Sequence, residues 1–518
     1  MTPGQTEPFV INQDSLEQQF KDHLADTDNH RILFSGPFGQ GKTTFLNKVF
    51  EDEQAEYHTI KLYPVNYSVS SNEDVFQLIK FDILTQLIGK YGNQLDLQQE
   101  DFSKLLTAQV FVRDSMSLTP WIEAILSCFG NIGKSSSNFF KAFTDTVKDF
   151  NAFHKAIQPN ETKDIETFVG ALINKERSAI EMDSISEKVK ELIIRLQAKT
   201  EHKVVLVIDD LDRLDPEHIF RLFNVFSTHF EYRGESLDGN GCNKFGFDKI
   251  IFVCDIENIR RIYRHKYGAG VDFKGYLDKF YSHAPFDFDN RHFVCGVVYH
   301  LLRELKANEK SRSNTRFIYL TQESSRYNMF VSTIEWLLNN LINARLLNLR
   351  SLLQVTDVRL KDIPITINPN SLDSSSYPLI ILFQLLLAYY PTIDIIKEKL
   401  DSLAQDFYKD KNSYNSEKNV DNSSVHSAVL GYAIPFITDP KKMITYRLED
   451  KDKTVIYSKE LTCYIHFKAE ANFELRTSEF YFLKSTSEED LESENFELNV
   501  FEVLSVALSS AKKIGVLE

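Results

Sequence analysis

Cysteine is sparse in this sequence, and its placement excludes several kinds of site. The cysteines are odd in number and never in C-x-x-C spacing, at positions 128, 242, 254, 295 and 463. Such a set offers neither a disulfide framework nor a cysteine zinc site, and it is typical of a reducing compartment. Histidine shows no metal-ligand spacing either, since His292 and His300 are too far apart along a helix to share one metal.

A long hydrophobic run is also lacking. The most apolar stretch, residues 379–390, is interrupted by Gln384 and is too short to cross a bilayer, so it predicts a buried helix. The first eight residues contain neither the charged nor the apolar segment of a secretory signal. We therefore expect a cytoplasmic protein with no membrane association.

Positive charge is in deficit. The chain has 59 Lys and Arg against 74 Asp and Glu, a net charge of −15. This balance argues against a surface that coats nucleic acid, so a nucleic-acid partner is not indicated, although a local basic groove is not excluded. Hydrophobic content of 42% and charged content of 26% are ordinary for a globular protein, and a length of 518 residues predicts about two to four domains.

One short segment has the pattern of a phosphate-binding loop. Residues 36–43 read G-P-F-G-Q-G-K-T, between an apolar run at 32–34 and a helical pattern at 44–50. Glycines let backbone N–H groups and the helix N-terminus face phosphate oxygens, the lysine reaches the β- and γ-phosphates, and the threonine hydroxyl binds Mg²⁺. We predict that the nucleotide contacts Gly36, Pro37, Phe38, Gly39, Gln40, Gly41, Lys42, Thr43 and Thr44.

An acidic pair supplies the second half of such a site. Residues 203–208 are a run of β-favouring residues that ends in Asp209 and Asp210, as expected of a central parallel strand. In P-loop NTPases an aspartate at this place holds Mg²⁺, and a neighbouring carboxylate can polarise the attacking water. We assign Mg²⁺ to Thr43 and Asp209, and catalysis to Lys42 and Asp210.

Strand and helix patterns alternate along the first half of the chain. Apolar strands at 32–34, 57–63, 203–208 and 249–254 are separated by helical patterns, which predicts a doubly wound parallel α/β sheet. Residues 293–306, 327–354 and 379–403 read as helices, and alternation over 453–483 predicts a small β-rich element. We expect a nucleotide domain at 1–290, a helical domain at 291–408 and a mixed C-terminal region at 425–518.

The motifs together resemble a known family. Residues 207–216, V-I-D-D-L-D-R-L-D-P, strongly resemble the KAP family of P-loop NTPases, a branch of the STAND/AAA+-like group. Similar family motifs precede it at 63–68 and follow it at 251–255 and 276–280. The set keeps the family's order, and the resemblance covers roughly residues 10–290. It implies a P-loop NTPase that uses ATP and Mg²⁺.

The sequence departs from the family pattern in two places. Phe38 stands where the family usually has Trp, so an aromatic residue is retained. Many members carry transmembrane helices between the two nucleotide motifs, and here a helical insertion at about 91–165 is expected. Its most apolar part, residues 118–132, contains Pro120 and Glu123 and is too short to span a membrane.

Four further residues are candidates for the site. Asp212 and Arg213 could orient the site or contact a neighbouring subunit, or they could form an ion pair at the start of a helix. Asp255, assigned as catalytic, could sense the γ-phosphate through a water or cap the helix that follows it. The resemblance places Arg350 where related ATPases carry an arginine that touches nucleotide.

These features predict an ATPase that acts as a nucleotide-dependent switch or assembly machine, working as a homo-oligomer or with an effector protein encoded nearby. The resemblance to soluble bacterial members implies a role in antiphage defence. The alternative is a nucleotide-binding scaffold with little turnover, because many related ATPases have Glu where this chain has Asp210.

Overall fold

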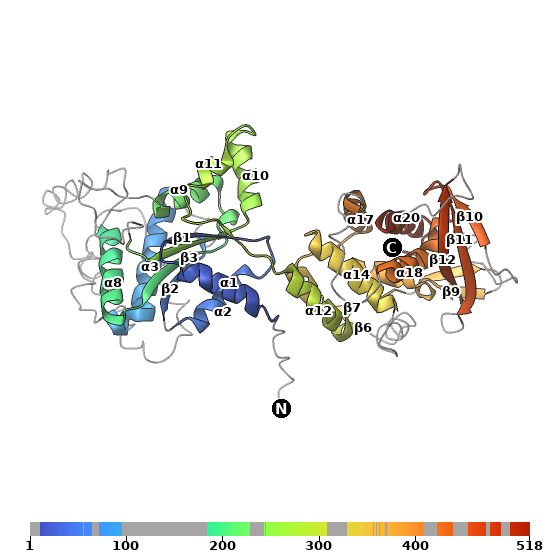
Figure 1. Cartoon of the computed structure of the whole chain (residues 1–518), viewed down its shortest axis with the longest axis horizontal. Helices are drawn as coiled ribbons and strands as arrows, with labels where there is room; N and C mark the ends of the chain where they lie inside the picture. Colours follow the sequence, from blue (N-terminus) through green and yellow to red (C-terminus); the bar gives the residue numbers. More distant parts are fainter. Residues whose placement is uncertain are drawn as a thin grey trace, which may run out of the picture. The chain divides into compact units, whose positions relative to one another are not determined.

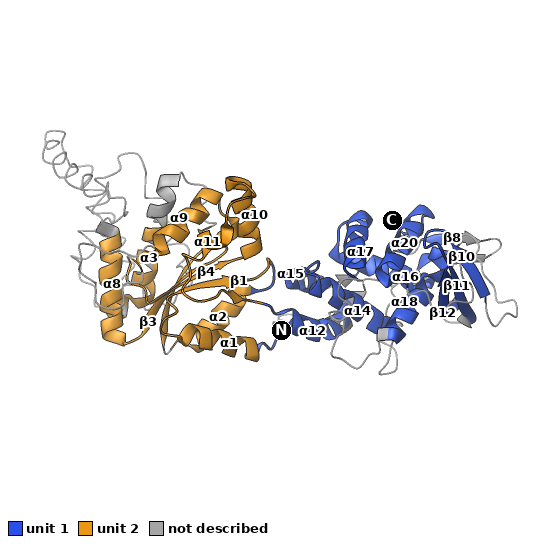
Figure 2. Cartoon of the chain, turned by 45° about the horizontal axis from the view of Figure 1, so that its top comes forward, with its two compact units in different colours: residues 1–13, 39–41, 289–518 blue, residues 14–38, 42–288 orange. Residues whose placement is uncertain are grey.

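The computed structural model describes residues 11–54, 56–64, 72–95, 184–227, 243, 245–307, 329–355, 357–358, 360–361, 363–367, 370–407, 422–438, 454–472, 477–487 and 498–517. These residues fall into two compact units, coloured in Figure 2. Unit 1 comprises residues 1–13, 39–41 and 289–518, and unit 2 comprises residues 14–38 and 42–288. Most of the predicted insertion at 91–165 lies outside the described residues.

Unit 2 is built on a parallel sheet. Its five strands are ordered β2-β3-β4-β1-β5, and every neighbouring pair is parallel. The strands are β1 (Arg31–Ser35), β2 (Tyr57–Leu62), β3 (Lys203–Ile208), β4 (Lys249–Cys254) and β5 (Phe286–Asp287). Residues Val204 to Ile208 of β3 are all buried, as predicted for a central strand with both faces covered.

Helices cover both faces of this sheet (Figure 1). They are α1 (Asp14–Ala25), α2 (Lys42–Asp52), α3 (Asn72–Leu95), α8 (Ser184–Thr200), α9 (Pro216–Ser227), α10 (Ile256–Tyr267) and α11 (Phe273–Leu277). On one face Phe34 of β1 packs against Phe20 of α1 and Phe45 of α2. On the other face Leu33 joins a core with residues of α3, α8 and α9, and α3 lies beside α8. The predicted doubly wound α/β sheet is confirmed.

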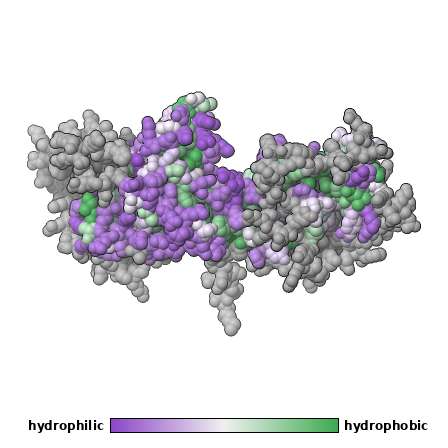
Figure 3. Space-filling view, viewed as in Figure 1, coloured by the Kyte–Doolittle hydropathy of each residue, from purple (hydrophilic) through white to green (hydrophobic). Residues whose placement is uncertain are grey.

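One face of unit 2 is largely polar. On the face shown in Figure 3, hydrophilic residues cover most of its described part. Two large side chains at and just after the end of α10, Tyr267 and Val271, are exposed.

Unit 1 is mostly helical and contains one large apolar core. Its helices are α12 (Arg291–Glu304), α14 (Met329–Asn343), α15 (Leu349–Gln354), α16 (Pro378–Tyr389), α17 (Ile393–Phe407), α18 (Asn422–Ile437) and α20 (Val500–Lys513). Trp336 of α14 stacks on Phe501 of α20 with ring centroids 5.0 Å apart. This core joins the predicted helical domain to helices near the C-terminus.

Small sheets complete unit 1. The predicted β-rich element is an antiparallel sheet of β10 (Thr454–Ser458), β11 (Cys463–Asn472) and β12 (Thr477–Ser487), against which α18 packs. Two short pairs join β6 (Lys306–Ala307) to β7 (Asp357–Val358), and β8 (Pro364–Ile367) to β9 (Asn370–Asp373).

Two segments predicted as single helices are each divided. The segment 327–354 forms α14 and α15, separated by a turn in which Arg345 has a φ of 59°. The segment 379–403 forms α16 and α17, which meet at 102°. Pro391 lies at that break, and proline disfavours helix at the residue before it.

No single helix among the described residues is long and apolar enough to cross a membrane. The bent pair of α16 and α17 passes the same test of length and composition only when its two helices are taken together. Leu379 to Leu386 of α16 are buried inside unit 1, as predicted for this apolar run.

Candidate nucleotide site

The carboxyl ends of β1 and β3 bring together the threonine and the aspartate predicted to bind metal. Thr43 lies in the first turn of α2, which follows β1, and Asp209 follows β3 directly. Because the strands are parallel, both ends lie at one edge of the sheet, although β4 separates the two strands. Thr43 Oγ1 donates a hydrogen bond of 2.5 Å to Asp209 Oδ2. The predicted pair is therefore in direct contact.

The Asp209 carboxylate is nearly inaccessible, with 3% of the residue exposed. Burial raises its pKa, and the hydrogen bonds from Thr43 and from the Asp210 N–H oppose this shift. A buried carboxylate is stabilised by a nearby cation. Carboxylate and hydroxyl oxygens are the ligands that Mg²⁺ prefers, so this pair fits the implied metal. Among the described residues no group of three or more His, Cys, Asp or Glu could hold a metal ion, so phosphate and water oxygens would complete its shell.

The Lys42 amine is buried at the start of α2, with 7% of the residue exposed. Its Nζ donates to the backbone oxygens of Gly36, at 2.6 Å, and of Pro37, at 3.2 Å. These partners are dipoles without formal charge, so the ammonium remains a centre of positive charge inside the loop. An anionic phosphate brought to this place would be stabilised by it.

Gly36 is fixed by close packing. A Cβ atom added there would lie 2.9 Å from the backbone oxygen of Phe288 and 3.2 Å from its Cβ. The Phe288 N–H donates to the Ser35 oxygen, so this backbone segment is held against the end of β1. Only glycine fits without displacing the loop.

Residues 39–41 of the loop make their contacts within unit 1. Gly39 has a φ of 79°, and its Cβ position lies 2.9 Å from the side chain of Asn348. The Arg350 N–H donates to the Gly39 oxygen at 3.0 Å, and Asn290 Nδ2 donates to the Gln40 oxygen at 2.7 Å. Arg350 thus lies beside the loop through its backbone, while the predicted contact of its side chain with nucleotide stays a prediction. Nothing in the sequence identified the two asparagines, apart from the helix-cap position of Asn348.

Asp210 adopts an unusual backbone conformation. Its φ of 52° and ψ of 37° are left-handed, which is uncommon for a residue with a Cβ and tolerated best by Asn and Asp. Arg213 Nη1 lies 3.1 Å from its Oδ2, at the start of the short helix Leu211–Arg213. The guanidinium carbon of Arg213 lies 4.3 Å from the ring centroid of Phe38. The ion-pair interpretation of Arg213 is therefore the one observed, with Asp210 as partner.

Asp255 caps α10. Its Oδ1 accepts from the backbone N–H groups of Glu257, at 3.0 Å, and Asn258, at 3.4 Å. The Asn258 side chain in turn donates to Asp212 Oδ2 at 3.1 Å. The capping interpretation of Asp255 is observed, and its catalytic role stays a prediction.

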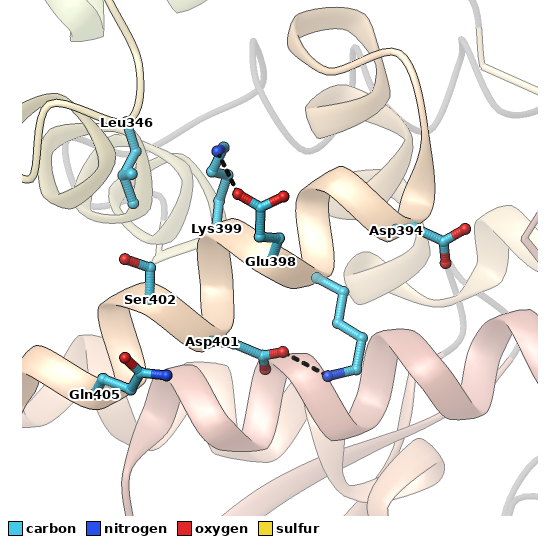
Figure 4. Close-up of a pocket in the computed structure, with 8 residues that line it drawn as sticks. Leu346, Asp394, Glu398, Lys399, Asp401, Ser402 and Gln405 are labelled. Atoms are coloured by element: carbon cyan, nitrogen blue, oxygen red, sulfur yellow. Dashed lines mark hydrogen bonds and ion pairs between the residues drawn. The ribbon is translucent and has the colours of Figure 1, made fainter. Parts of the chain in front are cut away.

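Unit 1 has a cavity of its own (Figure 4). Most of its lining comes from α17, and four of its charged side chains pair with one another: Lys397 with Asp401 at 2.6 Å and Lys399 with Glu398 at 2.9 Å. The fifth, Asp394, pairs with Lys512 at 2.7 Å. The cavity contains none of the residues predicted to bind nucleotide.

Comparison with known proteins gives two matches. Residues 21–354 match the family model described as the KAP family P-loop domain. The matched segment ends where α15 ends, so it extends past the predicted boundary at 290 and includes Asn290, Asn348 and Arg350.

The second match is to cytochrome P450 2B15 of Rattus norvegicus, with 22% identity over 160 residues, 31% of this chain and 28% of that protein. This likeness covers less than a third of either chain and implies no shared activity.

Proposed function

The chain belongs to the KAP family of P-loop domains, and from this premise we propose that it binds ATP with Mg²⁺ and hydrolyses it. The observation that carries the proposal is the contact of Thr43 with Asp209, next to the buried amine of Lys42. Three groups with the chemistry for metal and phosphate binding converge at one edge of the sheet. Family membership supports nucleotide binding, and the choice of ATP and its hydrolysis are our proposal.

Each residue has a separate task in this proposal. Lys42 binds the β- and γ-phosphates, and Thr43 and Asp209 hold the metal. When bound, Mg²⁺ would neutralise part of the charge on the β- and γ-phosphate oxygens. A water attacks the γ-phosphorus, its proton passes to Asp210, and the bond to the bridging oxygen breaks as ADP leaves.

The proposal extends to the use made of hydrolysis. We infer a nucleotide-dependent switch or assembly ATPase that works as an oligomer or with an effector protein in bacterial antiphage defence. The support for this extension is the resemblance of residues 207–216 to soluble KAP members. No contact within the described residues bears on partner identity.

A second candidate is a nucleotide-binding scaffold with little turnover. The pairing of Asp210 with Arg213 favours it, since the guanidinium already occupies Asp210 Oδ2. In this candidate bound ATP stabilises an assembly, and release of phosphate is not required.

Phosphate release and assembly size separate the two candidates. For an ATPase, Lys42→Ala and Asp209→Ala abolish phosphate release, and Asp210→Asn abolishes it while nucleotide binding persists. Unchanged release in Lys42→Ala and Asp209→Ala would contradict the proposal. For a scaffold, light scattering shows the same assembly with ATP and with a non-hydrolysable analogue, and Asp210→Asn behaves as wild type.

A further inference from the structure

We propose that Arg213 is a positioning residue that joins the phosphate loop to Asp210. Its guanidinium stacks on Phe38 of the loop and holds the Asp210 carboxylate through Oδ2. The inference rests on the proposed function, because it assigns to Asp210 the activation of water. It makes the placement of that carboxylate depend on the conformation of the loop that cradles phosphate.

The contacts form a closed circuit. Phe38 contacts Arg213, Arg213 pairs with Asp210, and the Asp210 N–H donates to Asp209 Oδ1 at 2.8 Å. Asp209 then accepts from Thr43, which is five residues after Phe38 in the chain. Two positions of the phosphate loop, Phe38 and Thr43, are thereby connected to the acidic end of β3.

The geometry suits a side chain that orients Asp210. The ion pair is made to Oδ2, so Oδ1 is the oxygen that an attacking water would approach. Asp210 has a left-handed backbone, which places its side chain differently from that of a helical or extended residue. A planar guanidinium fixed on an aromatic face has little freedom, so it can hold that carboxylate in one orientation.

Phe38 explains why the stacking is specific. The residue is 44% exposed, which leaves a large hydrophobic surface in a loop that must admit a polar ligand. The face of an aromatic ring attracts the guanidinium of Arg213. A leucine side chain of similar size has no such face and could not replace Phe38 in this contact. We therefore expect position 38 to require an aromatic residue, whether phenylalanine or tyrosine.

The decisive measurements are kcat, KM and Kd for Mg²⁺-ATP. Arg213→Ala and Phe38→Leu should lower kcat by about tenfold, as expected for a displaced reacting group, and leave Kd near that of wild type. Phe38→Tyr should retain wild-type turnover. Arg213→Lys should retain part of it, because the lysine ammonium carries the same charge but lacks the planar shape of the guanidinium. The kcat of the double variant should be no lower than that of the less active single variant, since the two substitutions remove the same contact.

Arg195→Ala is the matched control. Arg195 pairs with Glu191 on α8, a helix that contributes no residue to the predicted site, so its loss should leave kcat unchanged. Equal turnover in Phe38→Leu, Phe38→Tyr and wild type would overturn the proposal, as would a rise in Kd as large as the fall in kcat.

A readout without nucleotide separates this inference from the proposed function. If wild type releases no more phosphate than Lys42→Ala, hydrolysis itself is refuted. The melting temperatures of free wild type, Phe38→Leu, Arg213→Ala and the double variant then test the coupling. If the shifts in melting temperature of the two single variants are not additive in the double variant, the contact between the loop and Arg213 is supported. Additive shifts overturn it.

Discussion

Thr43 Oγ1 and Asp209 Oδ2 lie 2.5 Å apart although 166 positions separate them in the chain. The parallel order of β3, β4 and β1 brings these strand ends together, and no local sequence feature could do so. Asp209 is one of few carboxylates in the described core, and its burial is costly unless a cation offsets it. The first prediction follows from this cost.

Asp209→Asn should raise the melting temperature of the nucleotide-free protein at neutral pH and remove the Mg²⁺ dependence of nucleotide binding. Burial raises the folded-state pKa of Asp209, so the folded state binds the proton more tightly than the unfolded state. The destabilisation is full above the folded pKa and disappears as pH falls below the unfolded value. The amide carries no charge and can still accept from Thr43.

Differential scanning fluorimetry and Mg²⁺ titrations measure the two effects. Asp215→Asn is the control, since Asp215 is an exposed cap of α9 and asparagine also caps helices. A lower melting temperature for Asp209→Asn, with Asp215→Asn unchanged, would show that the charge of Asp209 stabilises the free protein.

Two substitutions of Asp255 distinguish a capping role from a catalytic role. Asp255→Ala removes a cap that accepts from Glu257 and Asn258 and should cost about 1 kcal/mol of stability. Asp255→Asn retains the cap and removes the charge, so it should melt as wild type and turn over more slowly. Normal phosphate release in Asp255→Asn would leave Asp255 with a structural role alone.

Gly36→Ala should weaken nucleotide binding. The added Cβ would lie 2.9 Å from the Phe288 oxygen. This oxygen belongs to the backbone, so it cannot rotate aside as the end of a side chain could. The loop must shift, which displaces the N–H groups expected to face phosphate. Gly270→Ala is the control because no atom lies within 4 Å of its Cβ position. Equal Kd values for the two variants, measured with a fluorescent nucleotide, would refute a rigid loop.

The burial of His58 predicts how the free energy of unfolding changes at acid pH. Burial and the neighbouring His202 lower the pKa of His58 to about 4, below the 6.5 of an unfolded histidine. Between these values the unfolded state binds the proton more tightly, so stability falls as pH decreases from about 6.5 to about 4 and then levels off. At about 1.4 kcal/mol per pKa unit, the full effect is on the order of 3 kcal/mol.

His58→Gln should flatten this dependence in denaturant titrations between pH 7 and pH 4. His265→Gln, at an exposed position on α10, should leave the curve as it is. A wild-type slope that persists in His58→Gln would assign the acid sensitivity to other groups.

Much of unit 2 could be predicted because its signals are local. The loop of residues 36–43 and the apolar run of residues 203–208 each identify a strand end, and parallel strands align those ends. The break at Pro391 also has a local signal, although the apolar pattern of 379–403 concealed it. The turn at Arg345 has none, since a positive φ at arginine follows from packing and not from propensity.

The rest of the site depends on contacts distant in sequence. Asn290 holds the oxygen of Gln40 across 250 positions, and Asn348 lies against Gly39. A polar residue next to a helix predicts a cap, and gives no indication of a second partner. The stacking of Arg213 on Phe38 was likewise beyond reach, because each residue has an ordinary interpretation in its own segment.

Equilibrium titration of Mg²⁺-ATP against wild type, Lys42→Ala and Lys48→Ala tests the central claim most directly. Lys42 is buried in the loop, whereas Lys48 lies further along α2, is partly exposed and pairs with the buried carboxylate of Glu17. We predict saturable binding by wild type and Lys48→Ala, and none by Lys42→Ala. Equal binding by all three proteins would contradict a phosphate site at residues 36–43.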